Sequence, residues 1–375
     1  MASAIPPYSG IICTEEQYIR SLNSSAIYCL TRSQSIGLTI VAETGLASLF
    51  AVCFVFVIII RNTIQHIRHA PAGKFTIVRE PMDIFMLSLF VADFVQALGA
   101  VMDIKWIRDG KVEIGAFCTA QGETGVAITT LLIAIYTFIG VWWRIGMGMG
   151  SVRVAKVIIG LVWLFIILMV VIGNATHSDK NDLYQSPTPY WCWIGEDYMQ
   201  FRIWGEYVWF WITLVFSFLA YIPLFLWSRG NITFSEYSWW RFSIHRASKF
   251  DNPYGTRRQS LAMIAYPVVY SILIIPLSVV RWIGFVQERG GRESHIGAAA
   301  TMSVIGIYGL SGACNVILLL TTRPNSILFS KGLDYEPRHT AAGMATYKSS
   351  SINETMGEQI NDLGRPPSRS SVGWS

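Results

Sequence analysis

Seven long apolar stretches alternate with polar segments along the first 320 residues of the chain. A helix needs about 20 mostly apolar residues to cross roughly 30 Å of hydrocarbon, so each stretch is predicted to be a transmembrane helix. The predicted spans are residues 36–60, 81–102, 118–143, 154–173, 204–227, 261–285 and 297–320. The pattern therefore predicts an all-α membrane protein, folded as a seven-transmembrane helix bundle.

The two ends of the chain lack this pattern. Residues 1–35 contain no continuous apolar region of a cleavable signal peptide, and we expect them to form an extracellular N-terminal segment. Residues 321–375 are rich in serine, which is typical of a disordered cytoplasmic tail. Within this tail, residues 325–331 are a candidate for a short amphipathic helix. The transmembrane domain is then residues 36–320.

Charged residues are scarce, at 14% of the 375 residues, whereas 52% are hydrophobic. A soluble domain typically carries roughly 25% charged residues, so the composition excludes a soluble globule and, for most of the chain, intrinsic disorder. The net charge is only +5, and the basic residues are spread between apolar runs. We therefore expect membrane lipids as surroundings and no nucleic-acid partner.

Basic residues concentrate in alternate loops, which fixes the expected orientation. Loops 61–80, 144–153 and 228–260 are rich in Lys and Arg, whereas loops 103–117, 174–203 and 286–296 balance fewer basic residues with acidic ones. Basic loops prefer the cytoplasm. We therefore expect the N-terminus outside, the C-terminus inside, and multi-pass insertion in the plasma membrane. Tryptophans near the ends of the spans fit interfacial belts: Trp106, Trp191, Trp193, Trp204 and Trp282 outside, with Trp142, Trp143 and Trp227 inside.

Four of the six cysteines fall on the predicted outer side, where disulfides form: Cys13, Cys29, Cys118 and Cys192. We predict a bridge between Cys118 and Cys192 and a second between Cys13 and Cys29, with four free thiols as the alternative. Asn23, in an N-S-S sequence, is the predicted outer glycosylation site.

Ionisable side chains inside the spans are costly unless they face the bundle or a water-filled cavity. Four of them lie in the predicted outer half of the bundle and are candidate ligand-binding residues: Glu43, Glu123, Glu206 and Arg281. The alternative for Glu206 and Arg281 is that they reach the headgroup layer. An acidic pocket of this kind would suit a cation or a polyhydroxyl compound.

Asp93 lies about 18 Å along its span, just past the middle of the bilayer. We expect it to join a hydrated network with Ser88, Tyr308 and Ser311. A neutral carboxyl held by one hydrogen bond is the alternative.

Prolines inside the spans are candidate hinges, because each removes a backbone donor and clashes with the preceding turn. Pro223, Pro267 and Pro276 are such residues, and Pro276 is the best placed to swing the inner end of its helix. Static kinks are the alternative.

The sequence lacks residues that several classes of membrane protein require for their function. All six histidines lie in loops or the tail, so an intramembrane zinc site has no histidine ligands, and residues 297–320 lack the lysine that retinal requires. A transporter built from two duplicated halves should show an internal repeat, and the sequence shows none. We expect neither enzymatic activity nor a cofactor or metal.

Three short motifs resemble a known family. They are C-T-A-Q-G at 118–122, I-A-I-Y-T-F at 133–138 and Y-W-C-W-I at 190–194, with further matches at 88–93 and 267–281. The chain resembles the fungal G-protein-coupled receptors related to the slime-mould cyclic-AMP receptors and the yeast glucose-sensing receptors, over roughly residues 43–323. The acidic-Arg-Tyr triplet of rhodopsin-like receptors is absent, and the Asn-Pro-x-x-Tyr box is reduced to Asn315.

The resemblance implies a receptor that binds a small-molecule ligand outside the cell and activates the α subunit of a heterotrimeric G protein, commonly controlling cyclic AMP. It also supports a conformational-switch role for Asp93, with Ser311, more than direct ligand contact. Arg144, Arg257 and Arg258 are the predicted G-protein contacts, although attraction to anionic lipid explains much of this basic charge. Ser260, in R-R-Q-S, resembles a kinase site. A transporter or lipid-binding membrane protein without G-protein coupling is the alternative function.

Overall fold

The computed structural model describes residues 10–24, 26–69, 80–114, 123–142, 149–176, 178–179, 182–188, 190–229, 231–235, 238–244, 257–289 and 297–322. All of them belong to one compact unit, residues 1–331. The predicted tail helix at 325–331 lies outside the described residues.

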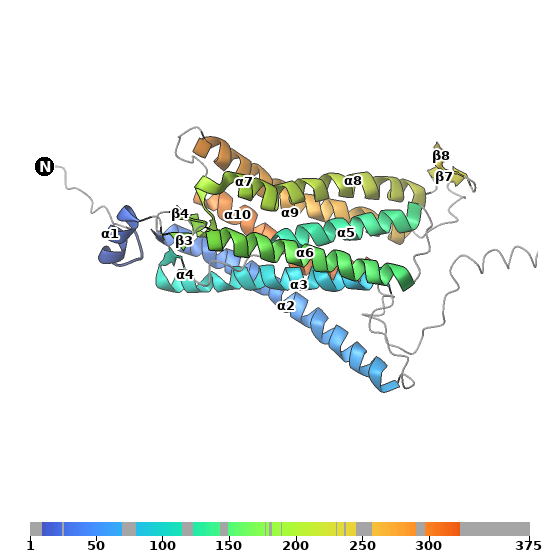
Figure 1. Ribbon diagram of the computed structural model, residues 1–375, viewed down its shortest axis with the longest axis horizontal. Helices are drawn as coiled ribbons and strands as arrows, with labels where there is room; N and C mark the ends of the chain where they lie inside the picture. The colour runs from blue at the N-terminus through green and yellow to red at the C-terminus, as the bar shows by residue number, and fades with distance from the viewer. Residues whose placement is uncertain are drawn as a thin grey trace, which may run out of the picture. The chain divides into compact units, whose positions relative to one another are not determined.

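Long helices running side by side form the body of this unit (Figure 1). They are α2 (Arg32–His69), α3 (Pro81–Met102), α5 (Glu123–Trp142), α6 (Met149–Thr176), α8 (Val208–Ser228), α9 (Arg257–Arg289), α10 (Ala298–Gly309) and α11 (Ser311–Thr322). Among the described residues, six helical segments are long and apolar enough to cross a membrane, and α5 supplies a shorter apolar stretch at Thr124–Gly140. These seven helical regions overlap the seven predicted spans.

The predicted boundaries differ in accuracy. The bounds of α3 are those predicted, because Pro81 is favoured in the first turn and Glu80 with Asp83 forms a capping box. By contrast, α2 extends beyond the predicted span at both ends, to 38 residues or about 57 Å. Its second half leans away from the other helices (Figure 1).

Two spans predicted as single helices are interrupted. The fifth begins as α7 (Met199–Arg202), passes through one π-helical segment, η3 (Ile203–Tyr207), and continues as α8. The last span breaks at Leu310, between α10 and α11. Neither interruption occurs at a proline.

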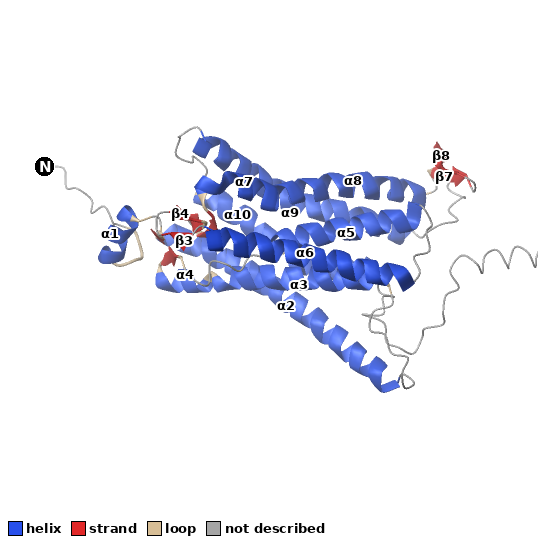
Figure 2. Ribbon diagram, in the orientation of Figure 1, coloured by secondary structure: helices blue, strands red, loops and turns tan. Residues whose placement is uncertain are grey.

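Short strands and small helices cap the bundle, which the sequence pattern did not predict (Figure 2). Near one end, which we call the hairpin end, lie α1 (Glu15–Asn23), α4 (Ile104–Asp109), η2 (Glu196–Tyr198) and three antiparallel pairs: β1 (Ile27–Cys29) with β2 (Lys111–Glu113), β3 (Ser178–Asp179) with β4 (Asp182–Leu183), and β5 (Gln185–Thr188) with β6 (Trp191–Ile194). The pair β7 (Ile232–Ser235) and β8 (Ser238–Ile244) lies at the opposite end (Figure 1). The all-α prediction therefore holds for the bundle only.

Burial separates a core from an apolar outer surface. Side chains such as Val52, Phe90 and Leu319 are fully buried where α2, α3 and α11 meet. Large apolar side chains on α6, including Val157 and Leu161, are exposed instead. An apolar exterior of this extent is what a hydrocarbon environment requires.

The predicted belt tryptophans fall into two groups. Trp204 and Trp282 are 67% and 38% exposed, as expected of interfacial residues. Trp106 and Trp193 are only 3% exposed, so for these two the belt prediction was wrong. Both belong to the core instead: Trp106 packs in one cluster with Val112 and Cys192, and Trp193, a residue of β6, packs in another with Tyr207 and Phe285.

Candidate functional site

The β5–β6 hairpin carries two indoles toward the bundle. Trp191 and Trp193 alternate with Cys192 along β6, so both are on the same face of the strand. Cys192 is 5% exposed and disulfide-bonded, and its predicted partner Cys118 lies outside the described residues. The predicted Cys13–Cys29 bridge is present, with an S–S length of 2.00 Å.

Trp193 is the centre of a packed cluster. Its ring stacks on Phe285 of α9 at 6.0 Å and 14°, and it meets Tyr207 edge-on. Its indole Nε1 donates a hydrogen bond of 3.0 Å to Oε2 of Glu206. Because an indole N–H needs a partner when buried, Glu206 fixes the depth at which Trp193 sits.

Two guanidinium groups complete this cluster. The guanidinium carbon of Arg202 lies 4.5 Å from the centroid of the Trp193 ring, and that of Arg281 lies 4.6 Å from it. Arg202 is 1% exposed, and its Nε donates to the Ile194 carbonyl oxygen at 2.7 Å. We call Trp193, Arg202, Glu206, Arg281 and Phe285 the Trp193 cluster.

The π-helical segment positions Glu206. A π turn contains one more residue than an α turn, so it rotates the side chains that precede it relative to those that follow. Glu206 is thereby 6% exposed and faces the bundle, while Trp204 faces outward. The Thr124 hydroxyl donates to the Gly205 carbonyl oxygen at 3.1 Å, which ties α5 to this segment.

Tyr190 directly precedes β6, and the charge of Arg281 influences the pKa of its hydroxyl. Burial raises the pKa of its hydroxyl, nearby Tyr28 raises it further, and the positive charge of Arg281 acts in the opposite direction.

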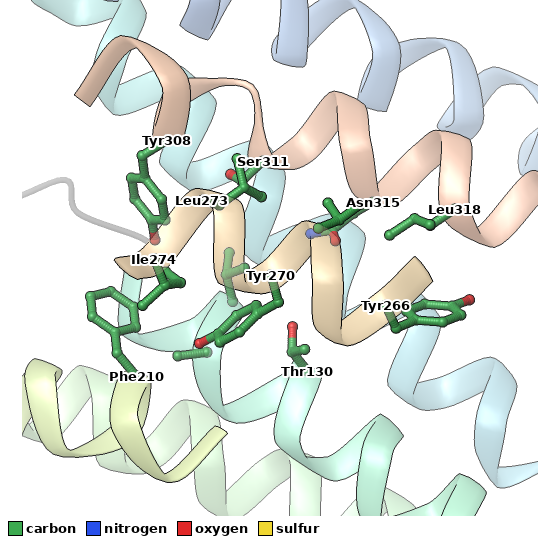
Figure 3. A pocket seen from close by; sticks show the side chains of 13 residues that line it. Thr130, Phe210, Tyr266, Tyr270, Leu273, Ile274, Tyr308, Ser311, Asn315 and Leu318 are labelled. Carbon is green, nitrogen blue, oxygen red and sulfur yellow. The ribbon is translucent and has the colours of Figure 1, made fainter. Parts of the chain in front are cut away.

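A small pocket lies deeper in the bundle, between α5, α8, α9, α10 and α11 (Figure 3). Its walls are mostly apolar, and its polar groups include Thr130, Tyr270, Tyr308, Ser311 and Asn315. The close-up shows the side chains of Tyr270, Thr130 and Asn315 gathered around one space (Figure 3). We call this the Asn315 pocket.

Asn315 links the pocket to Asp93. Its side-chain Nδ2 donates to both carboxylate oxygens of Asp93, at 3.0 Å and 3.1 Å, and Asp93 is 1% exposed. Ser88 instead contacts the Thr129 hydroxyl at 3.4 Å and accepts a hydrogen bond from Trp163 Nε1 at 3.1 Å. The hydrogen bonds described for Asp93 therefore go to Asn315, which was not among its predicted partners, and Ser88 bonds elsewhere. The predicted network with Tyr308 and Ser311 stays a prediction.

Comparison with family models gives one match. Residues 73–313 match the 7 transmembrane receptor (rhodopsin family). The chain belongs to this family. A search of curated proteins finds no match to the receptor.

The receptor places two of the four predicted ligand-binding residues together. Glu206 and Arg281 both contact Trp193. Glu43 does not join them, because it is exposed on the outer face of α2 among apolar side chains. Glu123 is the first residue of α5, but its side chain is not among the described parts of the structure, so its predicted role stays a prediction.

The remaining predicted residues are described in part. Ser311 is buried and lines the Asn315 pocket, and Pro276 lies inside α9, as does Pro267. Arg257 and Arg258 begin α9, and Ser260 follows in its first turn, although the structure describes no side-chain contacts for these three. Arg144 lies outside the described residues.

Asn23 ends α1 and is exposed, with its Nδ2 donating to the Ile19 carbonyl oxygen at 3.1 Å. Its glycosylation therefore stays a prediction. Within the described ranges, no group of three or more His, Cys, Asp or Glu side chains is arranged to hold a metal ion.

Two contributors had weak signals in the sequence: Arg202 lies in a predicted outer loop, and Trp193 was predicted to be a belt residue. Asn315 had the clearest signal, since an amide within a membrane helix needs a polar partner.

Proposed function

We propose that this receptor binds a small extracellular molecule at the hairpin end and activates the α subunit of a heterotrimeric G protein at the opposite end. The observation that carries the proposal is the family match over residues 73–313. Members of a receptor family of this kind generally act on G proteins and small ligands. The proposal includes the orientation, with the N-terminus outside and the C-terminus inside the plasma membrane.

The arrangement of polar groups supports signal transmission along the bundle. The Trp193 cluster joins the β5–β6 hairpin to α9 through Arg281 and Phe285. The Asn315 pocket then joins α9 to α11, and Asn315 binds Asp93 of α3. A ligand that repacks the first group changes the contacts of α9, whose two internal prolines offer hinges.

The cytoplasmic readout is the finer part of the proposal. Arg257 and Arg258 at the start of α9, together with Arg144, are the basic residues proposed to contact the Gα subunit. The resemblance to fungal receptors of the cyclic-AMP-receptor-like and glucose-receptor-like group supports cyclic AMP as the signal that changes downstream.

Nucleotide exchange tests the proposal directly. The purified receptor in nanodiscs is mixed with representative Gα subunits and βγ, and the rate of GTP-analogue uptake is compared with that of empty nanodiscs. We expect faster uptake with at least one Gα. We expect Arg257→Ala with Arg258→Ala to reduce the increase, because these residues lie at the proposed contact.

Arg108→Ala is the matched control, since this arginine is exposed at the hairpin end and pairs with Asp109 at 3.1 Å. It should leave uptake unchanged. The test is run both with and without cell-free medium from the cells that produce the receptor, as a source of ligand. If uptake then equals that of empty nanodiscs for every Gα tested, G-protein coupling is contradicted.

A further inference from the structure

Arg281 is a positive charge without a counter-charge among the described residues. Its guanidinium carbon lies 4.6 Å from the ring centroids of both Trp191 and Trp193. Its Nε is buried and has no hydrogen-bond partner within the described part of the chain. The ion pairs found there, Arg108 with Asp109 and Lys111 with Glu113, do not include it.

A second cation adds to this charge. Arg202 lies over the same Trp193 ring, so two guanidinium groups share one indole. Glu206 is the one buried carboxylate described in this cluster, and it already accepts a hydrogen bond from Trp193. The charge of Arg281, by contrast, has no ion-pair partner within the described residues.

A partly buried guanidinium such as that of Arg281 is costly unless an anion compensates its charge. Cation–π contacts with two indoles hold the guanidinium in place, but they supply no hydrogen-bond acceptor. Guanidinium has five N–H donors in a planar fork that matches a carboxylate or a phosphate. The groups around Arg281 are thus half of an anion site, with aromatic walls beside it.

We propose that the ligand of the hairpin-end site is a small soluble organic anion, whose carboxylate or phosphate group pairs with Arg281 while its apolar part packs against Trp191 and Trp193. This inference rests on the proposed receptor function and names the ligand class of that site. It replaces the cation or polyhydroxyl compound that the acidic residues of the sequence indicated, because Glu43 lies outside the site and Glu206 is engaged.

Thermal unfolding with paired probes tests the charge requirement. The receptor in phosphatidylcholine nanodiscs is heated with benzoate or phenyl phosphate at 10 mM, and in parallel with uncharged benzamide, at equal ionic strength. We expect each anion to raise the Tm by about 2–4 °C more than benzamide does, as ligand binding to the folded state requires. Glucose and choline chloride should resemble benzamide.

Three variants locate the effect. Arg281→Gln should abolish the difference between anion and amide, and Arg281→Lys should retain less than half of it, because lysine keeps the charge but loses the fork. If Arg281→Gln does not fold, the lysine variant decides. Arg108→Gln, at an exposed arginine of the same end, should behave as wild type.

The same measurement in nanodiscs containing phosphatidylglycerol separates a soluble ligand from a lipid headgroup. Stabilisation by phosphatidylglycerol alone, with no response to either soluble anion, overturns the proposal. An equal response to benzoate and benzamide, or an unchanged response in Arg281→Gln, also overturns it. None of these readouts requires a G protein, so anion binding without nucleotide exchange supports this inference and counts against the proposed coupling.

Discussion

The hydroxyl of Ser48 stands in for a backbone hydrogen bond at the break between α10 and α11. Its Oγ donates to the Gly309 carbonyl oxygen at 2.6 Å and accepts from the Ala313 amide at 3.2 Å. These two backbone groups are four residues apart and would pair directly in a continuous helix. Ser48 is 1% exposed, so no bulk water replaces it. We predict that Ser48→Ala destabilises the receptor through this break.

The magnitude follows from the two groups that lose their partner. A buried polar group left unsatisfied costs about 1–3 kcal/mol, whereas hydrogen bonds between membrane helices average about 0.6 kcal/mol because alternatives form. Closing the break would recover the loss, but a Cβ atom at Gly312 would already lie 3.3 Å from the Ser48 Cβ. With so little room for α11 to shift, we expect a net loss of about 1–3 kcal/mol.

Thermal unfolding in nanodiscs measures this loss. At roughly 2–4 °C for each kcal/mol, the Tm of Ser48→Ala should fall by roughly 2–12 °C. Ser303→Ala is the matched control, because Ser303 is exposed on α10 and its hydroxyl donates only to the Ala299 carbonyl oxygen at 2.8 Å. If both variants unfold within 1 °C of wild type, the hydroxyl does not hold the break and the reasoning is refuted.

Three other outcomes follow from the structure. Asp93→Asn keeps an acceptor for Asn315 but removes the ionisable carboxyl. Surface expression should therefore be normal, while the basal rate of nucleotide exchange changes. A basal rate equal to that of the wild type would mean that Asp93 has a purely structural role. Peptide mapping of the unreduced protein should recover Cys192 joined to Cys118, and recovery of Cys118 as a free thiol would contradict that pairing. Glycosidase treatment should remove a glycan from Asn23, whereas a glycan on Asn231 would reverse the predicted orientation.

Hydrophobic length predicted the helices well and their interruptions poorly. The start of α3 is determined by neighbouring residues in the sequence, namely Glu80, Pro81 and Asp83. The break at Leu310 is held by Ser48, more than 250 residues away in the chain, and no local pattern encodes that contact. The π-helical segment at residues 203–207 is likewise tied to α5 through Thr124.

The sequence predicts the position of a site residue only where the chemistry of its side chain forces that side chain to be buried. Asp93 could not face lipid, so its place in a polar network was predictable, but its partner Asn315 depended on how α3 meets α11. Glu43 shows the opposite case. A helix that is apolar all round does not reveal which side faces its neighbours, so depth alone could not place Glu43 inside or outside the bundle.

The packing of Trp193 determines what fraction of the receptors presents a formed ligand site. Its indole is held by Arg202, Arg281 and Phe285, so a ligand that packs against Trp193 binds only the receptors in which the hairpin keeps this position. The apparent Kd equals the intrinsic Kd divided by that fraction, so once the packed state is the minority, each further 1.4 kcal/mol lost from it weakens binding about tenfold. Substitutions in β5 would therefore shift the concentration range that the receptor detects, without altering a group that contacts the ligand.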